Sequence, residues 1–148
     1  MRTFRAAATT TLRDEVTNSP AETERAGVLL GERLQQGDVV LLTGELGAGK
    51  TTFVRGVARG TGSKAHVASP TFQLLRIYPG RLQLAHVDLF RVEKSSELRD
   101  LGLDELATDG AVVVEWGERL DVDGAAEIEI EHLGGDRRLI RTKRDLSH

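Results

Sequence analysis

A glycine-rich octapeptide constrains the fold of this chain more than any other feature. It reads GELGAGKT from Gly44 to Thr51 and matches the pattern G-x-x-x-x-G-K-[S/T] at every fixed position. The residues before it, DVVLLT at 38–43, form a continuous apolar run that is typical of a strand covered on both faces. A helix is expected from about Lys50 to Arg59, where glycines follow. Strand, glycine-rich loop and helix in this order predict a phosphate-binding loop (P-loop).

The residue types of the loop explain how it would hold a phosphate group. Glycines let the backbone curl until successive N–H groups point at one centre, and the helix that follows adds its unpaired N–H groups and positive dipole end. Lys50 would bring a full charge to the β- and γ-phosphates, and the Thr51 hydroxyl is a hard oxygen ligand for Mg²⁺. The expected phosphate-binding residues are Glu45, Leu46, Gly47, Ala48, Gly49, Lys50, Thr51 and Thr52. The alternative, an ordinary glycine-rich turn, is disfavoured by the strand and helix on either side.

The remaining segments predict one α/β P-loop NTPase domain over residues 1–148, with a mixed, partly parallel sheet flanked by helices and β-hairpins. Ser19 and Pro20 suit the start of a helix whose core side would carry Leu29, Leu30 and Leu34. The expected elements are a strand over 3–9, a helix over 20–36, a hairpin of 72–78 and 82–89, a helical region over 95–106 interrupted at Gly102, a strand over 111–114, and a hairpin of 125–133 and 137–143.

Two carboxylates lie at or near the ends of apolar strands. Glu115 ends the run AVVVE at 111–115, where P-loop proteins place the acid that orients magnesium. It could touch the metal, hold a metal-bound water or orient the attacking water. In HVDLFR at 86–91, His86 and Asp88 share one face of a strand. Asp88 could position or deprotonate a water at the γ-phosphate, with a structural role equally open, whereas a structural role is favoured for His86.

Two further residues are candidates by their place in the chain. Thr71, in SPTF at 69–72, resembles a switch residue that senses the γ-phosphate; a Ser-Pro turn is the alternative. Trp116 is the only tryptophan and directly follows Glu115. It either packs beside the nucleotide or fills the core, and core filling is the commoner role.

Composition and near-miss motifs narrow the function. The absence of cysteine excludes disulfides, thiolate zinc sites and thiol catalysis. The net charge is −3, whereas a stand-alone nucleic-acid binder is usually basic, so we expect another protein to hold any RNA. No segment resembles a leader or a membrane span, and a cytoplasmic location is expected. The segments TKRD at 142–145 and DVDG at 121–124 lack the context of guanine-binding motifs, so adenine is favoured by default.

Four blocks together closely resemble the bacterial TsaE (YjeE) family. They are GELGAGKTTF at 44–53, SPTF at 69–72, HVDLFR at 86–91 and VEW at 114–116, and their order and spacing cover nearly the whole chain. The resemblance implies a Mg²⁺-dependent ATPase that is needed to make threonylcarbamoyladenosine in tRNA. It implies the partner proteins TsaB and TsaD, of which TsaD performs the transfer to tRNA, while the TsaE-like subunit binds the complex and hydrolyses ATP to ADP.

The same resemblance assigns roles by position. Lys50 and the loop amides would hold phosphate, Thr51 and Glu115 would serve Mg²⁺, and Asp88 would activate water. Thr71 would lie in the switch-like loop and Trp116 by the site. The turn around Asp136 would approach the nucleotide, and the helix start near Ser19 and Pro20 would lie near the base. Two alternatives stay open: a nucleotide-gated module that clamps a partner with incidental hydrolysis, and a small-molecule kinase.

Overall fold

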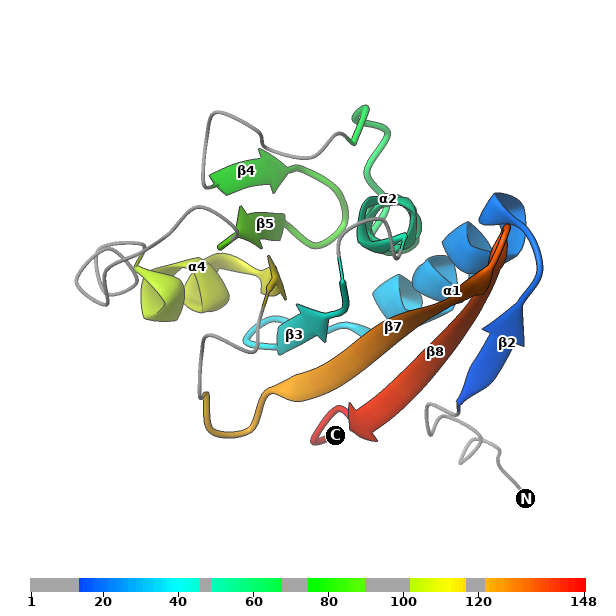
Figure 1. The fold of residues 1–148 in the computed structure, drawn as a ribbon. Coiled ribbons are helices and arrows are strands. Elements are labelled where there is room, and N and C mark those ends of the chain that lie inside the picture. Colours follow the sequence, from blue (N-terminus) through cyan, green and yellow to red (C-terminus); the bar gives the residue numbers. More distant parts are fainter. Residues whose placement is uncertain (1–13, 46–48, 68–74, 90–101, 117–121) are drawn as a thin grey trace, which may run out of the picture.

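The computed structural model describes residues 14–45, 49–67, 75–89, 102–116 and 122–148. These residues form one seven-stranded sheet and three helices (Figure 1), in the order β2-β8-β7-β3-β6-β5-β4 across the sheet. In chain order the elements are β2 (Glu15–Thr17), α1 (Pro20–Arg33), β3 (Val39–Thr43), α2 (Lys50–Gly60), β4 (Leu75–Tyr78), β5 (Leu84–Asp88), α4 (Leu103–Asp109), β6 (Ala111–Glu115), β7 (Ala126–Gly134) and β8 (Arg137–Arg144).

The sheet is mixed, as the sequence predicts. β3 pairs in parallel with β6 on one side and β7 on the other, and β5 pairs in parallel with β6. The hairpins β4–β5 and β7–β8 are antiparallel, and both were expected from the sequence. The short strand β2, which the sequence did not predict, pairs antiparallel with β8 at the sheet edge. The strand expected over 3–9 lies outside the described residues.

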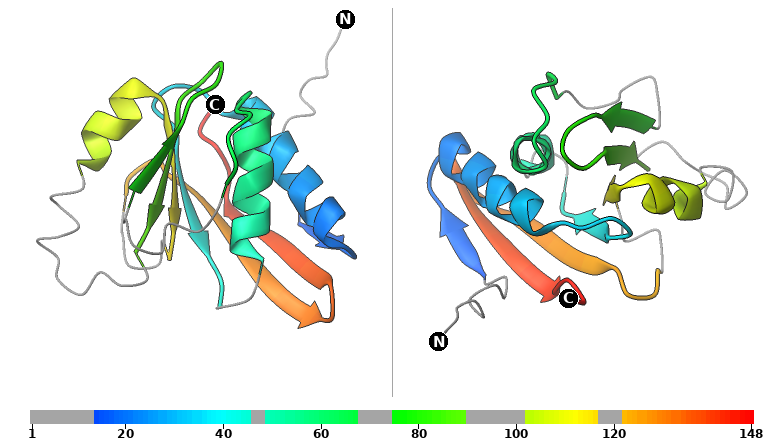
Figure 2. Two further views of the ribbon diagram at one scale, coloured as in Figure 1. Left: turned by 90° about the horizontal axis from the view of Figure 1, so that it is seen from above. Right: turned by 180° about the vertical axis from the view of Figure 1, so that it is seen from behind.

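The helices lie on both sides of the sheet, with α1 and α2 on one face and α4 on the other (Figure 2, left). The first face holds the larger apolar core, which includes Leu30, Phe53 and Ile128. The second face has a smaller core around Leu41, Val87 and Val114, against which α4 packs. This double covering explains why β3 and β6 read as continuous apolar runs rather than alternating ones.

Helix α1 begins as the sequence predicts but ends earlier, and it buries Leu30 and Leu34 as expected. Ser19 caps it by accepting a hydrogen bond from the Glu22 N–H at 3.1 Å. The helix stops at Arg33 rather than at residue 36, because Leu34 is extended and the Asp38 carboxylate accepts the Gln35 N–H at 2.7 Å in the turn that follows. The expected core position of Leu29 is wrong, since its side chain is 54% exposed.

Helices α1 and α2 touch backbone to backbone through two pairs of glycines. Gly27 and Gly31 on α1 face Gly56 and Gly60 on α2, each pair four residues apart. A Cβ atom placed on Gly56 would lie 1.8 Å from the Glu24 carbonyl oxygen, a separation that no real side chain can adopt. The crossing therefore requires glycine, and it holds the starts of the two helices next to each other.

The helical region expected over 95–106 is described only from Gly102 onward. There, Gly102 adopts a left-handed φ of 66° and is the N-cap residue of α4. None of the helices in the described ranges has both the length and the apolar composition needed to cross a membrane.

Candidate functional site

Three adjacent parallel strands bring the candidate residues to one edge of the sheet. Leu42 of β3 and Asp88 of β5 are both in register with Glu115 of β6. The P-loop leaves β3 at this same edge, beginning with Gly44. Since ligands of parallel α/β sheets bind beyond the carboxyl ends of the strands, Asp88 and Glu115 lie where such a site is expected.

The end of the P-loop and the start of α2 form an anion-binding geometry. Gly49 adopts a left-handed φ of 98°, which glycine tolerates best, and its carbonyl accepts the Phe53 N–H at 3.0 Å in the first turn of α2. The first N–H groups of α2 have no partner within the helix itself and point outward from its positive end. Thr51 and Thr52 lie in this first turn, both partly buried.

Lys50, the first residue of α2, is buried. Its Nζ donates a hydrogen bond to the Gly44 carbonyl and lies 3.5 Å from the centroid of the Trp116 ring. Both of these partners are uncharged. An anionic phosphate oxygen would form a stronger hydrogen bond with this ammonium group than a carbonyl does.

Trp116 has a backbone conformation that is unusual for a large side chain. Its φ is 63°, and it is the one non-glycine residue with positive φ in the described part of the chain. Side chains adopt this region at some energetic cost, and such outliers cluster at functional sites. The turn places the indole against the smaller core on one side and under Lys50 on the other.

Glu115 is held by a buried histidine. His86 Nε2 lies 2.5 Å from Glu115 Oε2, and His86 Nδ1 lies 3.3 Å from the Tyr78 hydroxyl. The ring of His86 is fully buried and Glu115 is only 3% exposed. Among the described residues, no group of three His, Asp or Glu side chains could hold a metal ion. The hard oxygens of Thr51 and Glu115 do suit Mg²⁺, which usually takes one or two protein ligands and fills its shell with phosphate and water.

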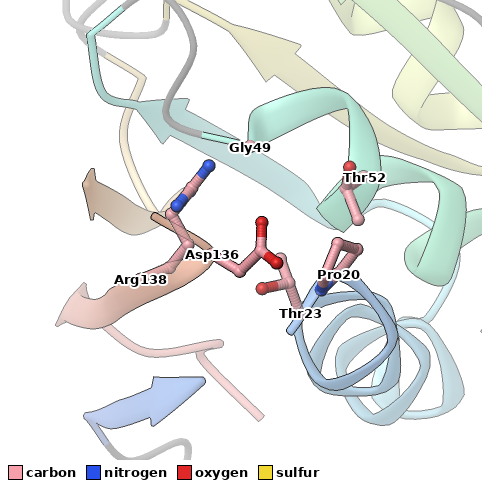
Figure 3. Close-up of a pocket in the computed structure, with 6 residues that line it drawn as sticks. All are labelled: Pro20, Thr23, Gly49, Thr52, Asp136 and Arg138. Atoms are coloured by element: carbon pink, nitrogen blue, oxygen red, sulfur yellow. The ribbon is translucent and has the colours of Figure 1, made fainter. Parts of the chain in front are cut away.

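A pocket lies beside the P-loop, between the start of α1, the start of α2 and the β7–β8 hairpin (Figure 3). β7 runs five residues beyond its last pairing with β3, so the hairpin tip projects past the sheet edge. Asp136 and Arg138 reach from this tip toward the two helices. The residues that line the pocket are Pro20, Thr23, Gly49, Thr52, Asp136 and Arg138.

Not every residue expected at the site lies in that pocket or in the described chain. Glu45 lines a second pocket on the β7 side of the loop, together with Trp116 and Lys143. Leu46, Gly47, Ala48 and Thr71 lie outside the described residues.

Sequence reasoning missed two features of the site. No motif points to Arg138, yet its Nε would lie 3.2 Å from a Cβ on Gly49, so the guanidinium group packs on the P-loop. The His86–Glu115 contact was also missed. The one available signal was that His86 and Asp88 share a strand face, which does not show that the neighbouring strand ends in a carboxylate on that face.

Comparison with known proteins identifies the family of this chain. The family model described as "Threonylcarbamoyl adenosine biosynthesis protein TsaE" matches residues 17–141. The chain belongs to the TsaE family.

TsaE proteins from several bacteria are similar over most of the chain. The one from Treponema pallidum is 44% identical over 106 residues, covering 71% of this chain and 78% of the relative. The one from Bacillus subtilis is 42% identical over 129 residues, covering 84% and 80%. The crystal structure of YdiB from Bacillus subtilis superposes with a TM-score of 0.70 at 34% identity, covering 89% of this chain and 84% of that one. The chain is thus a member of a family named for tRNA threonylcarbamoyladenosine biosynthesis.

Proposed function

We propose that this protein is a Mg²⁺-dependent ATPase that acts with a TsaB–TsaD complex in the threonylcarbamoyladenosine modification of tRNA. One observation carries the ATPase part: Asp88 and Glu115 lie in register at the edge where the P-loop and Lys50 lie. The role in tRNA modification rests on membership of the TsaE family. In this proposal the protein acts in the cytoplasm, where tRNA is modified.

In the proposed complex, the start of α2 and Lys50 bind the β- and γ-phosphates. Lys50 leaves the Gly44 carbonyl and the Trp116 ring for the phosphate oxygens, while the N–H groups of α2 donate to the same anion. Thr51 and Glu115 supply oxygens for the metal, Glu115 directly or through a bound water. Magnesium, when bound, would neutralise charge on the β- and γ-phosphates.

Hydrolysis requires a water in line with the bond between the γ-phosphorus and the bridging oxygen. Asp88 ends β5 beside Glu115, so its carboxylate can accept a hydrogen bond from that water. The water oxygen bonds to phosphorus, the bond to the bridging oxygen breaks, and ADP, phosphate and a proton are released. Asp88 is thus assigned to the water, and Glu115 to the metal.

The pocket in Figure 3 is the proposed site of the ribose and base, since it is continuous with the P-loop at Gly49 and Thr52. The position of the pocket also argues against recognition of a guanine base by the segment TKRD at 142–145. Asp145 pairs with Arg33 at the far end of α1, at 3.3 Å, whereas Pro20 in the pocket is the first residue of that helix. The two ends of a helix of this length are about 20 Å apart. We therefore assign the pocket to ATP and ADP.

The experiment that tests this proposal is ATP hydrolysis with Mg²⁺ by the purified protein, first alone and then with TsaB and TsaD. We expect slow hydrolysis alone and a clear increase on addition of the partners. ATP that is bound but never hydrolysed under either condition contradicts the ATPase and supports the nucleotide-gated module instead. A phosphorylated small molecule among the products would support a kinase.

A further inference from the structure

Three buried polar side chains form a chain across β4, β5 and β6 that ends at the proposed metal ligand. They are Tyr78, His86 and Glu115, and none is more than 3% exposed. The hydroxyl-to-Nδ1 distance is 3.3 Å, and the Nε2-to-carboxylate distance is 2.5 Å. Buried polar groups are costly unless they are hydrogen-bonded, and each of these groups finds a partner within the chain.

The direction of these hydrogen bonds follows from their partners. An ionised Glu115 carboxylate can only accept, so His86 Nε2 carries the hydrogen and donates it to Oε2. In the neutral imidazole, Nδ1 then has a lone pair and accepts the Tyr78 hydroxyl. Tyr78 thereby fixes both the tautomer and the plane of the ring that holds Glu115. The other oxygen of Glu115, Oε1, is left for a metal ion or a metal-bound water.

We propose that His86, oriented by Tyr78, is a positioning residue that holds Glu115 in the geometry needed for Mg²⁺. The inference rests on the proposed role of Glu115 at the metal. Partners behind a metal ligand commonly change metal affinity or activity by about 10- to 100-fold when removed. A His86 that only filled the core would affect stability and leave the response to magnesium unchanged.

The test measures ADP affinity by calorimetry at increasing Mg²⁺ concentrations. The readout is the magnesium concentration at which the increase in ADP affinity is half-maximal. His86→Leu keeps roughly the volume of the side chain and removes the donor, so it should raise this concentration about tenfold. His86→Gln keeps an N–H donor near the place of Nε2 and should restore most of the response. Tyr78→Phe keeps the ring and should give a smaller shift, about threefold. ADP affinity without Mg²⁺ should stay unchanged in all three variants.

A Glu115→Ala background shows whether His86 acts through Glu115. His86→Leu should cause no further magnesium shift in that background, and an additional shift of similar size would overturn the proposal. An unshifted response in folded His86→Leu would overturn it too. If His86→Leu does not fold, the magnesium response of Tyr78→Phe is the test instead. An unshifted response in Tyr78→Phe would then overturn the proposal. If the ADP affinity of the wild-type protein does not depend on Mg²⁺, the proposed role of Glu115 at the metal is itself refuted.

Discussion

At the scale of single residues, Lys50 is the group on which nucleotide binding is proposed to depend. Its ammonium is buried and contacts the Gly44 carbonyl and the Trp116 ring. In the proposed complex, the phosphate oxygens replace these partners and form stronger hydrogen bonds with the charge.

Lys50→Ala should weaken ATP binding by about 10- to 100-fold, because a hydrogen bond to a charged group contributes about 1.5–3 kcal/mol. The measurement is ATP affinity by calorimetry. Lys64→Ala, the same substitution at an exposed position away from the site, is the control and should change nothing. Equal affinity in the Lys50 variant and the wild type would contradict the P-loop assignment.

Asp88→Ala should spare ATP binding and lower the rate of hydrolysis by about 10²–10⁴-fold, the usual contribution of a positioned acid or base. Single-turnover kinetics and ATP affinity, measured together, separate the two effects. Asp109→Ala, at the exposed end of α4, is the matched control. A parallel loss of binding and rate would make Asp88 a structural or metal-site residue rather than one that handles water.

At the scale of elements, the crossing of α1 and α2 builds the site. Their paired glycines allow backbone contact, and this contact places Pro20 and Thr23 opposite Gly49 and Thr52 in the pocket. Arg81 strengthens the far end of the same crossing, because its Nη2 donates to the carbonyls of Gly31 and Gly60 at 2.9 and 3.2 Å. Helix packing therefore forms one side of the pocket, and the β7–β8 hairpin forms the other.

Gly56→Ala should destabilise the fold by about 3 kcal/mol or more, since the new methyl group would overlap the Glu24 carbonyl. In an unhindered helix the same change stabilises by about 1 kcal/mol, so the sign of the effect is itself informative. Urea unfolding measures it. Gly37→Ala is the control, because a Cβ atom at Gly37 would meet no atom within 4 Å. The only cost of that substitution is backbone strain at a φ of 97°. A Gly56 variant as stable as wild type would contradict the close crossing.

The two leucines of α1 give a second test at this scale. Leu30 is 1% exposed and Leu29 is 54% exposed. Leu30→Ala should lower the free energy of unfolding by about 2–5 kcal/mol, and Leu29→Ala by less than about 0.5 kcal/mol. Equal losses in urea unfolding would mean that α1 is rotated relative to the described structure.

At the scale of the whole molecule, the parts predicted from sequence are those governed by local rules. The elements β3 and α2, the two hairpins and β6 all follow from apolar runs, turn residues and glycine. The face of α1 was predicted less well because the residues on its core side include Thr23, Gly27 and Gly31. Small residues that face another helix produce no apolar stripe, so hydrophobic periodicity found Leu30 and Leu34 but misplaced Leu29.

The site shows the same division between local and long-range information. Sequence placed Asp88 and Glu115 at strand ends, but their shared register depends on β6 inserting between β3 and β5. The packing of Arg138 on Gly49 depends on the length of the β7–β8 hairpin and on where its tip falls. Contacts between distant segments such as these are set by the assembled sheet, and no short motif encodes them.

The most direct test of the account measures how many tRNAs each TsaB–TsaD complex modifies when this protein and ATP are supplied. The account predicts repeated turnover with ATP, and at most about one round with a non-hydrolysable ATP analogue or with Lys50→Ala. Equal, repeated modification with the analogue, or without this protein, would contradict the claim that its ATP hydrolysis sustains the reaction.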